Sequence, residues 1–275
     1  MLVANPREFY RQIYTQPFAL PAFNVCNLEM AKAVIEAAID EHAPVIVQTY
    51  PGDLAHAAFG EPPGPLALLI RSMALEAPVP VILHLDHGPG LEFNLRCLRA
   101  GYNSVMFDGH ALPLDEALAE TALIARVAHA LGAAVEGELG TFGGGQGSLE
   151  FTDPEQAPSM FEQGQVDMLA VSVGSEHGQA SRLDLELLAA IRDKAQGPLV
   201  LHGGSGIHEE DVHAAVQLGV VKINIGAAIA RAWCAGSRAT LDACADHYGV
   251  LSQSMQNVRQ VARHRLQLMG ASGRA

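Results

Sequence analysis

Three histidines that lie far apart in this sequence are each followed by glycine: His87-Gly88, His177-Gly178 and His202-Gly203. Neutral imidazole nitrogens are good ligands for Zn²⁺, and three protein ligands leave a fourth position open for a substrate. Glycine allows the backbone to approach a ligand closely. The three pairs therefore predict a metal site that performs chemistry, in preference to three histidines that only fill the core.

Carboxylates and glycine-rich segments accompany these histidines. Asp86 immediately precedes His87, and Asp108 and Glu138 each lie at the end of another apolar run. The segments 203–206 and 226–228 could receive a phosphate group through backbone N–H groups and a helix dipole. This combination favours a site that binds both a metal ion and an anion.

Eight short apolar or β-branched runs, separated by helix-period segments, predict the elements that carry these residues. Most of the runs lack strict alternation, which is typical of strands buried on both faces of a parallel sheet. Helices are expected over Leu28–Glu41, Pro113–Leu131 and Glu209–Leu218. The expected strands are Ala19–Val25, Pro44–Tyr50, Val79–Asp86, Ser104–Gly109, Ala133–Gly140, Met168–Gly174, Pro198–Gly204 and Val220–Gly226.

Eight βα units in 275 residues predict a (β/α)8 barrel, with residues 1–275 as a single domain. An open doubly wound sheet is the alternative, but its first strand would normally lead into a glycine-rich loop. Active sites of such barrels lie at the carboxyl ends of the strands. The polar residues expected there are Asn24, Tyr50, Asp86, His87, Asp108, Glu138, His177, His202 and Asn224.

Two local patterns predict further helix features. Thr152-Asp153-Pro154-Glu155 has capping-box spacing and predicts a helix start after the fifth strand. A helical extension is expected over Ser252–Met269, and its basic residues are interpreted as a solvated face. These basic residues are Arg259, Arg263, His264 and Arg265.

The composition excludes several classes of protein. The formal net charge is −13 and 49% of residues are hydrophobic, which argues against a nucleic-acid binder and against a disordered chain. No apolar run reaches the roughly 18 residues of a membrane span, and the first residues lack the apolar core of a signal peptide. The four cysteines form no CxxC pair and are interpreted as buried apolar groups. A cytoplasmic protein with no membrane partner is expected.

The sequence resembles the short form of the class II, metal-dependent fructose-bisphosphate and tagatose-bisphosphate aldolases. The resemblance runs over nearly the whole chain, through PAFNVCNLE, PVILHLDHG, GYNSVMFDG, VEGELG, LAVSVGSEHG, PLVLHGGSGI and LGVVKINI. It implies a zinc-dependent aldol or retro-aldol lyase that acts on a ketose or ketose phosphate. Such a reaction leaves an enediolate, whose charge Zn²⁺ can stabilise as a Lewis acid. A homodimer or homotetramer is also implied.

The resemblance assigns roles to individual residues of this sequence. His87, His177 and His202 become the zinc ligands, and Asp86 becomes the acid/base that handles the aldehyde hydroxyl. Asp108 and Glu138 correspond to carboxylates near a second or mobile cation position, divalent or monovalent. The substrate-binding residues would be Asn24, Tyr50, Gly178, Gly203, Ser205, Asn224 and Gly226.

Four departures from the family pattern surround the substrate. Tyr50 stands where relatives carry serine, and Gln146 lies in a loop that usually supplies an acidic residue. Ala227 replaces a hydroxyl residue after Asn224, and Gln179 begins a shortened segment after His177-Gly178. These changes predict that the metal chemistry is retained and that the substrate differs, as a differently substituted or less phosphorylated ketose.

Other interpretations stay open at this point. A homologue that binds metal and sugar without turnover would explain the missing loop carboxylate. A metal hydrolase is less favoured, because the first strand offers Asn24 instead of an HxH pair. His84 is expected to point into packing, and a Schiff-base role for Lys222 is disfavoured because a metal-ligand set is present.

Overall fold

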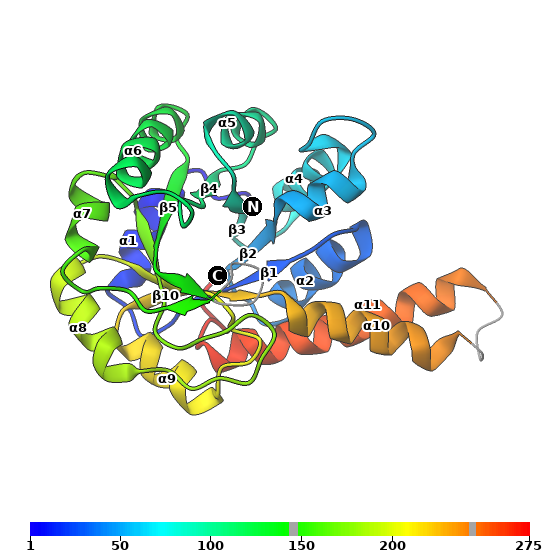
Figure 1. Ribbon diagram of the computed structural model, residues 1–275. Helices are drawn as coiled ribbons and strands as arrows, with labels where there is room; N and C mark the ends of the chain where they lie inside the picture. The colour runs from blue at the N-terminus through cyan, green and yellow to red at the C-terminus, as the bar shows by residue number, and fades with distance from the viewer. Residues whose placement is uncertain (143–147, 242–245) are drawn as a thin grey trace.

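The computed structural model describes residues 1–142, 148–241 and 246–275, and eight parallel strands close a barrel at its centre (Figure 1). The strands are hydrogen-bonded in the order β1-β10-β9-β8-β5-β4-β3-β2, which confirms the predicted (β/α)8 barrel. The open-sheet alternative is wrong because β1 pairs with β10. The barrel strands are β1 (Leu20–Asn24), β2 (Val45–Thr49), β3 (Val81–Gly88), β4 (Ser104–Phe107), β5 (Ala134–Leu139), β8 (Met168–Val171), β9 (Leu199–Leu201) and β10 (Val220–Ile225).

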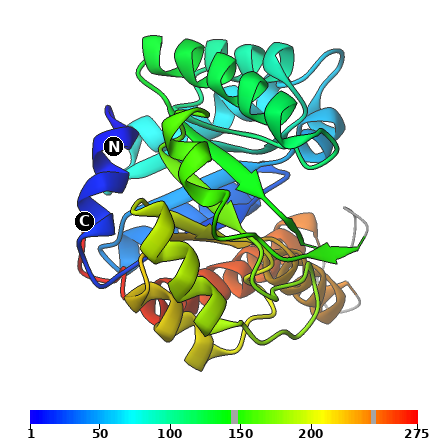
Figure 2. The same ribbon diagram turned by 60° about the vertical axis from the view of Figure 1, so that its left-hand side comes forward.

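Helices surround the barrel, as Figures 1 and 2 show. A short antiparallel pair, β6 (Thr141–Phe142) with β7 (Leu149–Glu150), follows β5. In the described parts of the chain, no helix combines the length and apolar composition needed to cross a bilayer. The helices are α1 (Pro6–Tyr14), α2 (Leu28–Asp40), α3 (Pro51–Ala57), α4 (Gly64–Glu76), α5 (Leu91–Arg99), α6 (Leu114–Ala130), α7 (Ala157–Glu162), α8 (Leu185–Ala195), α9 (Glu209–Gln217), α10 (Ala227–Thr240) and α11 (His247–Leu268).

Polar residues occupy part of the barrel interior. The strand register aligns a row of four of them: Asn24, Gln48, His84 and Ser104. Paired residues of neighbouring parallel strands point to the same face, so these side chains share the interior face. Glu136 on β5 and Lys222 on β10 are fully buried as well. The interior therefore changes from apolar to polar on the way to the carboxyl ends of the strands.

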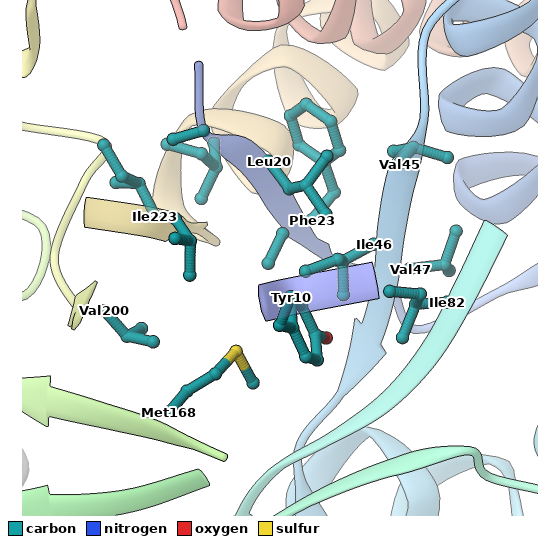
Figure 3. Close-up of a cluster of buried hydrophobic side chains, with 14 of the residues drawn as sticks. Tyr10, Leu20, Phe23, Val45, Ile46, Val47, Ile82, Met168, Val200 and Ile223 are labelled. Atoms are coloured by element: carbon teal, nitrogen blue, oxygen red, sulfur yellow. The ribbon is translucent and has the colours of Figure 1, made fainter. Parts of the chain in front are cut away.

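Helix α1 covers the amino ends of the strands. Its Arg7 pairs with Asp167, which directly precedes β8, at 2.9 Å between Nε and Oδ1. Tyr10 is fully buried, and Figure 3 shows its ring among strand residues such as Leu20, Ile46 and Met168. Burial raises the pKa of Tyr10, whose hydroxyl lies 3.4 Å from Ser104 Oγ. This helix therefore closes the end of the barrel opposite the predicted site.

The helical hairpin α10–α11 projects beyond the barrel in Figure 1. Helix α11 begins at His247, five residues before the predicted start, because Asp246 caps it by accepting a hydrogen bond from the Gly249 N–H. The interpretation of its basic residues as a solvated face holds for Arg263 and His264, which are exposed, whereas Arg259 and Arg265 are half-buried; all four contact other parts of the chain. Arg259 bonds to Asp40 of α2, Arg263 to Glu41, His264 to Glu209 of α9, and Arg265 to the Ser205 carbonyl.

Two further sequence-based interpretations are wrong. The capping-box segment starts no helix, because the Thr152 hydroxyl donates to the Leu139 carbonyl and accepts from the Ser172 N–H; α7 begins only at Ala157. Cys234 is exposed on α10, whereas Cys97 is buried as expected. Cys244 lies outside the described residues.

We predict that Tyr10→Ala lowers the free energy of unfolding by about 3–5 kcal/mol, because it leaves a large cavity at the closed end of the barrel. Tyr10→Phe is the matched control. It removes only the long contact to Ser104, and we expect a cost of about 1 kcal/mol or less. Urea unfolding of the three proteins measures both effects, and equal stability of the wild type and Tyr10→Ala would contradict this role.

Candidate metal centre at the carboxyl ends of the strands

The three predicted histidines come together at the carboxyl end of the barrel. His87 lies near the end of β3, and His177 and His202 follow β8 and β9. Their ring centroids are separated by 4.9 Å for His87 and His202, 6.0 Å for His87 and His177, and 6.2 Å for His177 and His202. One nitrogen from each ring lies within 4.8 Å of the others. This spacing suits a single metal ion held by three imidazoles.

The orientation of His87 is set by a carboxylate and by the backbone. Its Nδ1 lies 2.7 Å from Asp108 Oδ2, so Nδ1 carries the hydrogen of the neutral ring and Nε2 keeps its lone pair. The residue has φ = 51°, in the left-handed region that few side chains other than glycine adopt. Strained backbone of this kind is concentrated at functional sites.

His202 presents an available nitrogen in a buried position. Its Nε2 lies 3.0 Å from Glu136 Oε1, and its ring stacks on Phe142 at a centroid distance of 4.6 Å. Burial and the nearby charge of His87 lower the pKa of His202 well below its ordinary value, so the ring is neutral. Among the described residues, Nδ1 has no hydrogen-bond partner. A buried imidazole lone pair without a hydrogen-bond donor is suited to binding a metal ion.

Asp86 lies beside this cluster, with its Oδ1 3.9 Å from His87 Nε2. Asn24 Nδ2 donates to Oδ2 and Asn224 Nδ2 donates to Oδ1, both at 2.9 Å. Burial alone would raise the pKa of Asp86, but the charges of His87 and Lys222 and the Asn24 hydrogen bond lower it below its ordinary value. Asp86 is therefore ionised and able to accept a proton.

A second donor set shares His87 with Asp108 and Glu138, whose ligand atoms also lie within 4.8 Å of one another. Asp108 accepts a hydrogen bond from His87 through Oδ2 and a second one from His110 through Oδ1, which lies 2.5 Å from His110 Nδ1. These contacts to His87 and His110 outweigh burial and hold the pKa of Asp108 well below its usual range. The predicted carboxylates are thus placed where a second cation could bind.

Two of the predicted phosphate-binding residues, Ser205 and Gly226, lie at the start of α10. Ser205 Oγ accepts a hydrogen bond from the Ala228 N–H at 3.0 Å, which leaves its own hydroxyl hydrogen able to donate. Gly203 has φ = 68°, and a Cβ there would lie 2.8 Å from the Glu176 carbonyl oxygen. A Cβ at Gly226 would lie 3.1 Å from Asn24 Oδ1. Gly178 has φ = 77° and an exposed surface.

Tyr50 lies at the rim, at the residue after β2, and is 47% exposed. Its ring folds back over Gly52 and occupies the space of a side chain there, since a Cβ built on Gly52 would lie 2.5 Å from the phenol oxygen. The Tyr50 N–H donates to Asp53. Burial and the charge of Asp86 raise the pKa of Asp53 to about 7. Gln146 lies outside the described residues.

Several residues that contact the site were not predicted from the sequence. Glu136, two positions before Glu138, could have been found, because alternate residues of a strand share a face. His110 follows β4 in a loop, where no periodicity indicates its direction. The remaining ones are Gln48, whose amide donates to Asn24, and Asp53.

Known proteins resemble this chain in sequence and in fold. The profile described as fructose-bisphosphate aldolase class-II matches residues 4–274. The fructose-bisphosphate aldolase of Streptococcus pyogenes is 37% identical over 235 residues, covering 82% of this chain and 79% of that protein. The crystal structure of the YdjI aldolase from Escherichia coli K12 aligns over 100% of both chains, with 32% identity and a TM-score of 0.89. Fructose-bisphosphate aldolase from Campylobacter jejuni shares the fold, with a TM-score of 0.83 at 24% identity, over 98% of this chain and 96% of that chain.

We predict that zinc binding to the metal-free protein weakens as the pH falls. Burial opposes a charge on His87, yet Asp86, Asp108 and Glu138 together raise its pKa to about 9. Since a metal binds only the neutral ring, protons compete below that pH, and the affinity should drop roughly 100-fold over two pH units. Calorimetric titration in buffers of different ionisation enthalpy measures the affinity and the protons released.

Asp108→Asn tests the cause of this pH dependence. The variant removes one of the charges that raise the pKa of His87, so fewer protons should be released on zinc binding near neutral pH. An affinity that stays constant below pH 9 in the wild type would contradict the prediction.

Proposed function

Because the chain belongs to the class II fructose-bisphosphate aldolase family, and is therefore a metal-dependent aldolase, we propose that it cleaves a ketose or ketose phosphate at the histidine cluster. The observation that supports this most strongly is the position of Asp86. An ionised carboxylate lies beside three imidazoles, with each of its oxygens bonded to an amide. A metal ligand set alone would suit many reactions, whereas this carboxylate supplies the proton transfer that an aldol cleavage needs.

His87 through Nε2, His177, and His202 through Nδ1 would hold the metal ion. The donor set fits Zn²⁺, because it offers three imidazoles and the buried Nδ1 of His202 lacks a hydrogen-bond partner among the described residues. When bound, Zn²⁺ supplies a Lewis acid that polarises the ketose carbonyl and stabilises the enediolate charge. Asp108 and Glu138 would hold a second divalent or monovalent cation beside His87, whose two ring nitrogens are already engaged.

Asp86 would act as the base in the cleavage direction. It accepts the proton of the C4 hydroxyl as the C3–C4 bond breaks, so that C4 leaves as an aldehyde and the bonding electrons remain on the three-carbon product. In the aldol direction, it returns the same proton to the aldehyde oxygen. The amides of Asn24 and Asn224 keep the carboxylate in place and favour its charged form.

The substrate phosphate would lie at the start of α10, on the side of Gly203, Ser205 and Gly226. The Ser205 hydroxyl would donate to the anion, and the dipole of α10 would add positive potential, while the Ala228 N–H is donated to Ser205 Oγ. Gly178 would contribute backbone close to the same group. Asn224 would contact the ketose-derived part of the substrate, next to Asp86.

We further propose a substrate other than fructose or tagatose bisphosphate. At the rim, Tyr50 places an aromatic ring over Gly52 where relatives carry serine, and Ala227 offers no hydroxyl at the start of α10. Tyr50 would contact the part of the ketose that differs. A single domain over residues 1–275, a cytoplasmic location and a homodimer or homotetramer remain predictions.

We predict that Asp86→Asn lowers kcat for retro-aldol cleavage by about 10²–10⁴-fold, because the amide cannot accept the hydroxyl proton. Metal content should stay at the wild-type level, since His87, His177 and His202 are intact. His202→Ala is the contrasting variant and should lose both metal and activity. Steady-state cleavage assays with metal analysis separate the two, and full activity of Asp86→Asn would refute the role of Asp86.

A panel of ketoses and ketose phosphates tests the proposed substrate class. We expect cleavage of fructose and tagatose bisphosphates to fall far below ordinary enzyme turnover, about 10 s⁻¹, with another ketose cleaved faster. Tyr50→Ser combined with Ala227→Thr should raise activity on the bisphosphates. Ordinary turnover of the bisphosphates by the wild type would overturn the altered specificity. Zinc binding without cleavage, and without proton exchange on dihydroxyacetone phosphate, would instead indicate a binding protein.

A further inference from the structure

We propose that the buried ion pair between Lys222 and Glu136 is a positioning device that sets the ring tautomer of His202 and the amide orientation of Asn224. The pair would thereby prepare a metal ligand and, through Asn224, the carboxylate of Asp86. Its catalytic part rests on the proposed function, whereas its effect on His202 concerns the metal-free protein and stands independently of any substrate.

The pair lies inside the barrel and joins strands that are not neighbours. Lys222 Nζ on β10 is 2.8 Å from Glu136 Oε2 on β5, and β8 and β9 lie between these strands in the sheet. Both side chains are fully buried. Removing two charges from water costs about as much as their attraction returns, so a buried ion pair is a poor way to stabilise a core. The pair is therefore better explained by the contacts that its two charged groups make with neighbouring side chains.

Glu136 determines which nitrogen of His202 carries the hydrogen. An ionised carboxylate only accepts hydrogen bonds, and Oε1 lies 3.0 Å from His202 Nε2, so Nε2 must be the donor. The lone pair is then on Nδ1, the atom that has no hydrogen-bond partner among the described residues and that lies 3.6 Å from Glu138 Oε2. With the opposite tautomer, an N–H would point into the metal centre.

Lys222 determines how the Asn224 amide is turned. An ammonium group only donates, and Nζ lies 2.6 Å from Asn224 Oδ1, so the oxygen must face the lysine. The amide nitrogen consequently points the other way and donates to Asp86 Oδ1 at 2.9 Å. A flipped amide would place its oxygen against the Asp86 carboxylate and an N–H against the ammonium.

The same contacts argue against Lys222 as a nucleophile. Its amino group is fully buried and lies 2.8 Å from Glu136 Oε2 and 2.6 Å from Asn224 Oδ1. A Schiff base requires a neutral amine that the substrate carbonyl can reach. The role of Lys222 is therefore that of a positioning residue.

Removal of both charges together tests the proposal without leaving one of them unpaired. The double variant Lys222→Met/Glu136→Gln has side chains of similar size, and we expect it to fold with nearly wild-type stability. Its zinc affinity, measured by competition with a chromophoric chelator, should fall about 10–100-fold. The ¹⁵N shifts of His202 in the metal-free protein should change from one tautomer to a mixture. With saturating zinc, kcat should fall while KM changes little.

A second ion pair provides the matched control. Arg259→Met/Asp40→Asn removes the pair between α11 and α2, which lies outside the barrel, and should leave zinc affinity and the His202 tautomer unchanged. A folded Lys222→Met/Glu136→Gln variant with wild-type zinc affinity and a single Nε2–H tautomer would overturn the proposal. Because neither readout involves a substrate, this outcome is distinct from a failure to cleave any ketose. Borohydride trapping of a substrate on Lys222 would also contradict it.

Discussion

Polar groups inside a closed barrel can find partners only among themselves, and this constraint governs the centre of the molecule. Eight parallel strands exclude water from the region below the histidines, where unpaired polar atoms would be costly. Glu136, Lys222 and His202 are fully buried, and Asn224 almost so; each is oriented by its contacts with the others. The Glu136 carboxylate only accepts hydrogen bonds and the Lys222 ammonium only donates them. These two groups therefore limit the tautomer of His202 and the amide orientation of Asn224. The arrangement at the mouth of the barrel therefore follows from charges placed one layer below it.

The cluster of histidines and carboxylates at the mouth of the barrel is better suited to binding a cation than to stabilising the fold. His87 adopts a left-handed backbone conformation, and its pKa is raised by carboxylates that would also attract a cation. His202 is kept neutral and retains a lone pair without a donor among the described residues. The clustered carboxylates and the buried lone pair are unfavourable in a metal-free protein. A bound ion would relieve both, since it neutralises the carboxylates and uses the lone pair of His202.

The eight strands could be predicted because buried parallel strands read as apolar runs, and the histidines because each is followed by glycine near or beyond the end of a strand. The sequence offers less guidance inside the strands. Glu136 interrupts an apolar run, and only its spacing from Glu138 indicates that it faces inward. The partners of Arg259 and Arg263 on α11 lie on or next to α2, more than 200 residues earlier, so no local pattern could find them. Thr152 has the right spacing for a cap, but tertiary hydrogen bonds to Leu139 and Ser172 take its hydroxyl.

The formal charge of −13 would oppose a phosphorylated substrate if it acted on the molecule as a whole. Much of that charge, however, is paired away from the proposed phosphate position, as in the contacts of Asp40 and Glu41 with α11. Near that position lies a positive charge. Arg265 reaches from α11 to donate to the Ser205 carbonyl, and the Ala228 N–H of α10 donates to Ser205 Oγ. Charges that lie within a few ångströms outweigh distant ones screened by water and salt. The formal charge of −13 is therefore compatible with the anion position proposed at the start of α10, where Arg265 of α11 lies behind Ser205.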